Sequence, residues 1–330
     1  MKTGRFYINN TLLVNKLKRK GGRLKTDTDY SSAVFKTSNG EISVGYSIER
    51  DEGEKTLTML DFLILDTAYL IYKDYEKYRN TFTVRQLIHA IMGTNQPSSK
   101  EKAERFAREI EKLRHTRITI NYEAEAREKN AEDEGYIENE PLLPLEKIGK
   151  SKYKFIEKPP LYRYAEINSQ VISVPERLYY CGNTVRNTER NFLIKYALLH
   201  ELEVMRFVTT GRNKYNKKYS KDSIMYFEKS DRRSEPDGGL LTEIDWCIDE
   251  NESDIIKSES EIEEKLSTVA GLHTINDITE TIKKVLDYYV IIGYIEGYEI
   301  LRRNRKGAVT GIKIKGEIKY PDSTRSRTEP

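Results

Sequence analysis

The chain has 330 residues, of which 37 % are hydrophobic and 33 % are charged, and its net charge is only +3. This mixture supports two or three folded domains and excludes a wholly disordered chain. Its two cysteines stand in unrelated contexts, which excludes a disulfide framework and a cysteine-based metal site. The sequence shows no apolar leader and no apolar run of membrane-spanning length, so we expect a cytoplasmic protein without a membrane partner.

Charge is distributed in blocks along the chain. Basic side chains gather in residues 1–30, 206–221 and 302–327, and acidic ones gather in 123–146 and 249–264. Such blocks indicate basic docking faces separated by acidic connecting segments, although an ordinary solvated surface would also produce them.

Residues 1–56 are predicted to form a basic arm followed by short strands. Polar and apolar residues alternate over 42–48, as in a half-buried strand, and Asn39-Gly40 before this stretch is a strong hairpin-turn signal.

Three helices are predicted next, over 57–78, 83–93 and 98–117. Each opens with a Ser or Thr followed three positions later by an acid or amide, and such a capping box satisfies free backbone N–H groups. The third helix is amphipathic, with its apolar face formed by Ala103, Phe106, Ala107, Ile110 and Leu113.

A β-hairpin is expected to follow these helices. Residues 117–122 alternate as a strand does, 123–150 are expected to form a loop, and 153–167 could pair back as the returning strand. Three helices followed by a hairpin are the order of a winged helix.

The second half repeats this order less regularly. The expected elements are a helix over 187–206, short helices within 219–227 and 240–248, a capped helix over 274–289 ending at Gly293, a strand over 294–301, a turn at 304–307 and a return strand over 309–315.

We therefore expect an α+β, mainly helical fold with two tandem winged-helix domains that carry β-hairpin wings. The expected divisions are an arm at 1–56, winged-helix domain 1 at 57–168, winged-helix domain 2 at 169–319 and a flexible tail at 320–330.

DNA is the partner that this arrangement favours. The second helix of a helix-turn-helix motif lies in the major groove, where base edges differ, and a helix N-terminus favours a phosphate. In the first domain the candidate contacts are Ser98, Ser99, Lys100, Lys102 and Arg105, with Arg108 and Lys112 further along and closer to the DNA backbone. A solvated face balanced by neighbouring glutamates remains the alternative.

In the second domain the expected recognition helix is 274–289, with a basic wing behind it. The candidate helix contacts are Asn276, Thr279, Lys283 and Lys284, and Thr281 is also expected to be exposed. The candidate wing contacts are Arg302, Arg303, Arg305, Lys306 and Lys313, which suit phosphates or the minor groove.

Three segments of the first domain carry a resemblance to a known family: LTMLDFLILDTAYLIY, TVRQLIHAIMG and KEKAERFAREIEKLRHTRITINY. Their pattern and order resemble those of plasmid replication initiators with tandem winged-helix domains. The resemblance implies binding of double-stranded origin repeats, recruitment of host replication proteins and a possible homodimer, in which the first domain dimerises and the second reads the repeat. The acidic stretches at 123–146 and 249–264 depart from that pattern.

No catalytic site or cofactor is expected. The sequence has no Gly-rich phosphate-binding loop, and none of its four histidines forms the His-x-His pair of a metal-dependent nickase. A transcriptional regulator on the same scaffold and a protein-interaction module without DNA binding remain open alternatives.

The second wing gives a direct test. Charge reversal of Arg302, Arg303 and Arg305 together is expected to weaken binding to duplex DNA at low salt, because each lost phosphate contact lowers a salt-dependent affinity. Electrophoretic mobility shifts measure the change, and undiminished affinity would remove this wing from the interface.

Overall fold

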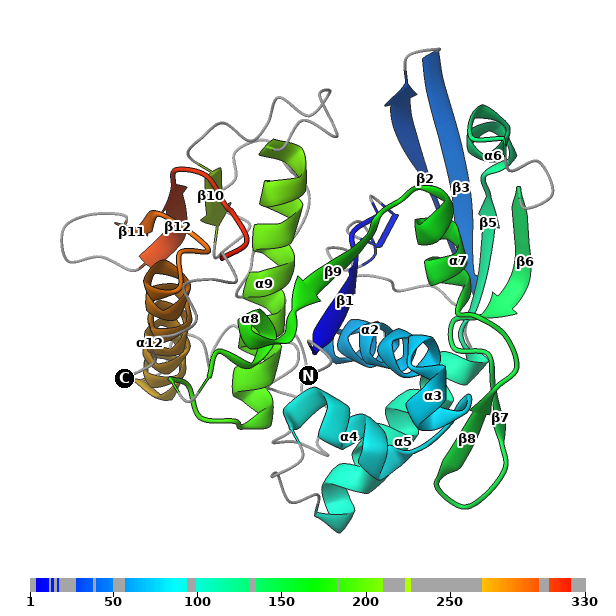
Figure 1. The fold of residues 1–330 in the computed structure, drawn as a ribbon, viewed down its shortest axis with the longest axis horizontal. Coiled ribbons are helices and arrows are strands. Elements are labelled where there is room, and N and C mark those ends of the chain that lie inside the picture. The colour runs from blue at the N-terminus through cyan, green and yellow to red at the C-terminus, as the bar shows by residue number, and fades with distance from the viewer. Residues whose placement is uncertain are drawn as a thin grey trace. The chain divides into compact units, whose positions relative to one another are not determined.

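The computed structural model is an α+β protein with open sheets that divides into two compact units, Met1–Pro175 and Glu176–Pro330 (Figure 1). It describes residues 4–11, 13–14, 17, 28–37, 40–49, 57–93, 99–130, 135–182, 184–209, 223–226, 269–302 and 309–321. The division follows Pro175, whereas the sequence places the domain boundary between residues 168 and 169.

Three helices of the first unit confirm the sequence prediction: α2 (Met59–Lys73), α4 (Val84–Met92) and α5 (Lys100–His115). The capping boxes of α2 and α4 are both formed. The cap of α5 is Ser99, whose hydroxyl accepts from the Lys102 amide at 3.2 Å, one residue later than predicted. The helix expected over 57–78 is interrupted at Asp74, after which α3 (Tyr75–Tyr78) follows.

A three-stranded antiparallel sheet accompanies these helices. It consists of β4 (Thr81–Thr83), β7 (Leu145–Lys147) and β8 (Lys152–Phe155), in the order β4-β8-β7. The expected pairing of 153–167 with 117–122 is therefore wrong. The rings of Phe82, Tyr153 and Phe155 are buried together, and this burial draws β8 to β4.

A four-stranded sheet joins two strands that precede α2 to two strands that lie between α5 and β7 in the chain. Its strands are β2 (Thr28–Thr37), β3 (Gly40–Glu49), β5 (Arg117–Asn121) and β6 (Tyr136–Pro141), in the order β2-β3-β5-β6. The β2–β3 hairpin and β5 confirm the sequence prediction. The strand that pairs with β5 is β6, within the expected loop, and α6 (Glu123–Glu128) lies between them.

The N-terminal segment belongs to the first unit. Strand β1 (Arg5–Asn9) pairs with β9 (Val171–Pro175), and α7 (Pro160–Ile167) precedes β9. The stretch at 160–167 is therefore a helix and not part of a returning strand. Tyr162 of α7 stacks on Tyr69 at 3.7 Å between ring centroids and donates to Asp66 at 2.5 Å, so tyrosines link α7 to α2.

The second unit contains α8 (Glu176–Tyr180), α9 (Glu189–Thr209), β10 (Ser223–Tyr226), α12 (Val269–Ile291), β11 (Gly297–Arg302) and β12 (Val309–Lys315). Its sheet has the order β10-β12-β11. The predicted helix over 187–206 and the two C-terminal strands are confirmed. The short helix expected within 219–227 is wrong, because 223–226 form a strand, and 240–248 lie outside the described residues.

Helix α12 starts before its predicted cap. Thr274 lies inside the helix, which begins at Val269, and the predicted end is confirmed because Gly293 has φ +75°. Beyond it, Tyr294 donates to the buried Glu203 of α9 at 2.6 Å. Tyr320 donates to the same carboxylate at 3.2 Å, so Glu203 ties the C-terminal part of the unit to α9.

One buried ion pair joins α2 to α5. The Lys112 ammonium lies 2.7 Å from the Asp61 carboxylate and 2.6 Å from that of Glu109. Burial raises the pKa of Asp61 to about 7, with the charge of Lys112 opposing this shift and that of Glu109 adding to it. Burial alone would lower the pKa of Lys112, but the two carboxylates raise it above its ordinary value. Lys112, which the sequence suggested for the DNA backbone, therefore faces the core.

Replacing this ammonium should destabilise the first unit. We expect Lys112→Met to lower the free energy of unfolding by about 3–5 kcal/mol near pH 8, since Asp61 is left as an uncompensated buried charge. The loss should be smaller at pH 5, because the Asp61 carboxyl then takes up a proton. Urea unfolding at both pH values measures it, with Lys100→Met on the exposed face as control. Equal losses in the two variants would contradict this role.

Candidate nucleic-acid interface

The N-terminal half of α5 carries the predicted contacts of the first unit. Ser99, Lys100 and Arg108 are exposed, and within the described residues the ion pair of Lys100 is a long surface contact with Glu104, at 3.8 Å. Lys102 and Arg105 are half-buried. Burial, followed by the charge of Arg105, lowers the pKa of Lys102, whose ammonium lies 3.7 Å from the Met92 sulfur.

The exposed cations of α5 are therefore Lys100 and Arg108, while Lys102 and Arg105 have only part of their side chains accessible. Ser98 lies outside the described residues.

The β7–β8 hairpin carries basic residues that the sequence analysis missed. Lys150, Lys152 and Lys154 are all exposed, and none of them forms an ion pair within the described part of the chain. Tyr153 and Phe155 alternate with them and are buried. This alternation, next to the turn-forming Gly149, is a signal that could have identified the hairpin.

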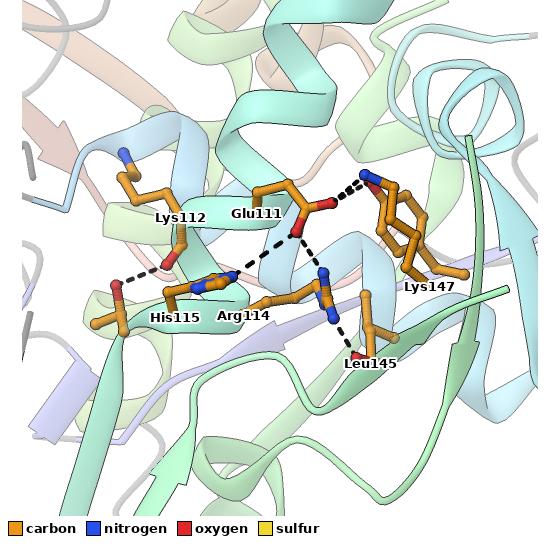
Figure 2. A network of polar contacts seen from close by, with 8 residues as sticks. Glu111, Lys112, Arg114, His115, Leu145 and Lys147 are labelled. Atoms are coloured by element: carbon orange, nitrogen blue, oxygen red, sulfur yellow. Dashed lines mark hydrogen bonds and ion pairs between the residues drawn. The ribbon is translucent and has the colours of Figure 1, made fainter. Parts of the chain in front are cut away.

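A carboxylate of α5 fixes this hairpin in place (Figure 2). Glu111 Oε1 accepts from Lys147 Nζ at 2.8 Å and from Tyr153 Oη at 3.0 Å. Its other oxygen accepts from Arg114, whose Nε donates to the Leu145 carbonyl at 2.9 Å. Figure 2 shows Glu111 with Lys147 on one side and Arg114 and His115 on the other.

The electrostatics of Glu111 keep it ionised. Burial alone would raise the pKa of Glu111, but hydrogen bonds from Lys147 and Tyr153 and the charge of Arg114 lower it below its ordinary value. Burial and the bond to Glu111 raise the pKa of Tyr153, so this hydroxyl remains a donor. The carboxylate thus accepts from three donors, which come from β7, β8 and α5 itself.

These contacts set the direction of the hairpin along α5. Leu145 lies beside Arg114 and Lys147 beside Glu111, so β7 runs back toward the N-terminal half of the helix. Arg108 is three residues before Glu111, on the same helix face. The hairpin turn and the exposed guanidinium of Arg108 consequently lie along one side of α5.

The first turn of α4 also borders the hairpin turn. The Val84 amide donates to the Ser151 carbonyl at 3.0 Å. Arg85, the next residue, is exposed. Together with Lys150 and Lys152 it forms what we call the basic hairpin face.

In the second unit one predicted contact is wrong. Thr279 is buried, with only 6 % of its surface exposed, because it lies on the same stripe of α12 as the buried Ile282 and Leu286. Lys284 is exposed, and Lys283 is half-buried and 3.7 Å from Glu280. Thr281, expected to be exposed, is half-buried, and the side chain of Asn276 lies outside the described residues.

The second wing is described only at its base. Arg302 is exposed at the end of β11, and Lys313 is half-buried on β12 opposite Glu299. Arg303, Arg305 and Lys306 lie outside the described residues. Arg302 and Lys313 therefore lie in one sheet, and the predicted DNA contacts of Arg303, Arg305 and Lys306 stay predictions.

Among the helices in the part of the chain that the structure describes, none combines the length and the apolar character of a membrane span. Within the same residues, no group of three or more His, Cys, Asp and Glu side chains could hold a metal ion.

Comparison with known proteins gives a distant structural likeness. No protein-family model matches this sequence, and no curated protein matches it. A crystal structure of RctB domains 2-3 (RctB-155-483) has 8 % identity and a TM-score of 0.35, over 89 % of this chain and 93 % of that one. A crystal structure of selenomethionine derivatives of RctB domain 2 and domain 3 has 11 % identity and a TM-score of 0.37, over 92 % and 99 %. Neither score establishes a common fold, so the assignment of function rests on this chain's own residues.

Glu111 can be tested as the anchor of the hairpin. We expect Glu111→Ala to raise amide hydrogen exchange over residues 145–155 about tenfold, because losing its hydrogen bonds costs ~1–2 kcal/mol of local stability. Exchange read by mass spectrometry measures this. Glu101→Ala, on the exposed surface of the same helix, is the control, and unchanged exchange in the hairpin would show that Glu111 does not hold it.

Proposed function

We propose that this protein is a non-enzymatic, sequence-specific double-stranded DNA-binding protein with two winged-helix units, and that it initiates replication of a plasmid or mobile element. The observation that carries the proposal is a strand order shared by the two units. In each three-stranded sheet the first strand pairs with the third, and the second lies at the edge: β4-β8-β7 and β10-β12-β11.

This strand order is typical of a winged helix, in which the second and third strands form the hairpin wing and the third strand also pairs with the first. In both units a helix precedes the sheet, the first strand follows, and a second helix comes before the two strands of the hairpin. In the first unit α2, β4, α4, α5, β7 and β8 supply the complete series, with the β5–α6–β6 segment inserted after α5. The insertion leaves the helix-turn-helix pair α4–α5 and its wing intact.

The charges of the first unit support a duplex as ligand. The N-terminal turn of α4 and the exposed residues of α5 are the parts of a helix-turn-helix that meet backbone and groove. Arg85 supplies a cation at the former, and Lys100 and Arg108 supply cations at the latter. The basic hairpin face extends this charge along the side of α5, where phosphates of an adjoining groove would lie.

The replication role follows from the resemblance to plasmid replication initiators, which also implies origin repeats, host replication proteins and a homodimer. A transcriptional regulator remains the second candidate. Direct repeats beside the gene that are bound by the purified protein favour initiation, whereas a palindrome in its own promoter alone favours regulation.

A protein-interaction module predicts no salt-dependent DNA affinity. Nicking of supercoiled plasmid in the presence of Mg²⁺ would contradict a non-enzymatic role.

The basic hairpin face provides the test of DNA binding. We expect Lys150→Ala/Lys152→Ala to reduce the slope of log K against log salt concentration by roughly 2, since each lost phosphate contact contributes about 0.9. Fluorescence anisotropy with a duplex of mixed sequence, titrated at several salt concentrations, measures the slope.

The matched control is Arg117→Ala/Arg127→Ala. Both of these side chains are exposed, but they lie on β5 and α6 of the inserted segment. Equal slopes for the two double variants would remove the hairpin from the interface. Absence of duplex binding by the unmodified protein at low salt would refute the proposed function.

A further inference from the structure

An apolar side chain stands at the turn of the basic hairpin. Ile148 is 44 % exposed and directly follows Lys147 at the end of β7. Its amide donates to the Lys152 carbonyl at 3.0 Å, which closes the turn over Gly149, Lys150 and Ser151. A single exposed isoleucine on a neutral surface needs no explanation. This one lies among lysines that would approach phosphates.

The backbone on either side of Ile148 is fixed. Lys147 and Tyr153 are bound to Glu111 of α5, and Ser151 accepts from the Val84 amide of α4. The turn is therefore attached to both helices of the helix-turn-helix pair. A side chain that is to deform a ligand needs such a support, since a loose one would move instead of the ligand.

The charge around the turn complements a duplex. Lys150, Lys152 and Arg85 are exposed close to it, and their cationic groups suit phosphates. The minor groove is only about 6 Å wide, so phosphates of both strands border any side chain that enters it. Proteins that enter this groove often insert an apolar residue between base pairs, and the duplex then bends away from the protein.

We propose that Ile148 is a wedge that inserts into the minor groove of the bound duplex, partly unstacks one base step and bends the DNA. This inference rests on the proposed DNA binding and adds a deformation to it. The lysines of the turn hold the phosphates on either side, and Ile148 supplies the contact with the base edges. A flexible pyrimidine–purine step is the preferred site of insertion.

The same hairpin contains a matched control. Ile156 is 65 % exposed, more than Ile148, but it lies at the open end of the hairpin, where its amide donates to the Pro144 carbonyl at 3.0 Å. Ile156 is four positions after Lys152, which corresponds to about 13 Å along an extended chain. Both isoleucines can be shortened without disturbing a buried core.

The experiment uses the full chain and a duplex of about 30 base pairs that contains TA steps and carries a donor and an acceptor dye at its ends. We expect the unmodified protein and Ile156→Ala to increase energy transfer at saturation. Ile148→Ala should bind within about tenfold of the unmodified affinity, with an unchanged salt slope, and leave energy transfer at the value of free DNA. Ile148→Thr, which keeps the β-branched shape, should behave like Ile148→Ala.

The outcomes separate the two proposals. Bending by both Ile148 variants equal to that of the unmodified protein, or tight binding without bending by the unmodified protein, overturns the wedge and leaves DNA binding in place. Loss of bending in Ile156→Ala as well as in the Ile148 variants shows a general effect of the hairpin and also overturns it. No binding by the unmodified protein refutes the proposed function itself.

Discussion

The first unit depends on one buried ammonium. Lys112 is the only cation at 4 Å or less from Asp61 among the described ion pairs, and Asp61 is at the same time the carboxylate that caps α2. Helix α2 and helix α5, the one proposed to enter the groove, are thereby joined at one point. Glu111, the neighbouring residue, faces the other way and holds the hairpin. Of these two successive residues of α5, Lys112 contacts α2 in the core and Glu111 contacts the β7–β8 hairpin.

This arrangement accounts for two of the acidic residues of α5, Glu109 and Glu111. Glu109 and Glu111 would weaken a DNA-binding helix if they were exposed and unpaired, because they would repel phosphates. Instead Glu109 forms an ion pair with Lys112, and Glu111 accepts from Arg114, Lys147 and Tyr153. Their charges are compensated inside the protein, and Lys100 and Arg108 remain on the surface. A net charge near zero for the whole chain is therefore compatible with a local basic face.

Local signals in the sequence predicted the helices well. Thr58, Thr83 and Gly293 mark helix ends through hydrogen bonds or backbone angles that depend on close neighbours, and the apolar stripe of α5 predicts its buried face. Strand pairing was harder to predict. Strand β6 has a single buried apolar residue, Ile137, so it resembles a loop, and β8 pairs with a strand far earlier in the chain. Thr279 has a polar side chain, which favours an exposed position, but it lies on the buried stripe of Ile282 and Leu286 and so faces the core.

The pairing of β1 with β9 has a consequence for how the first unit is made. Arg5 lies opposite Pro175, so the first and last strands of this unit are neighbours in space. Non-local pairings of this kind form slowly, because the chain loses the entropy of closing a long loop before the strand contacts contribute any stabilising free energy. During synthesis the unit cannot be completed until its last strand has left the ribosome. A nascent chain that already contains α4, α5 and the hairpin is then still an unfinished domain, and its acquisition of function is set by translation of the residues that follow.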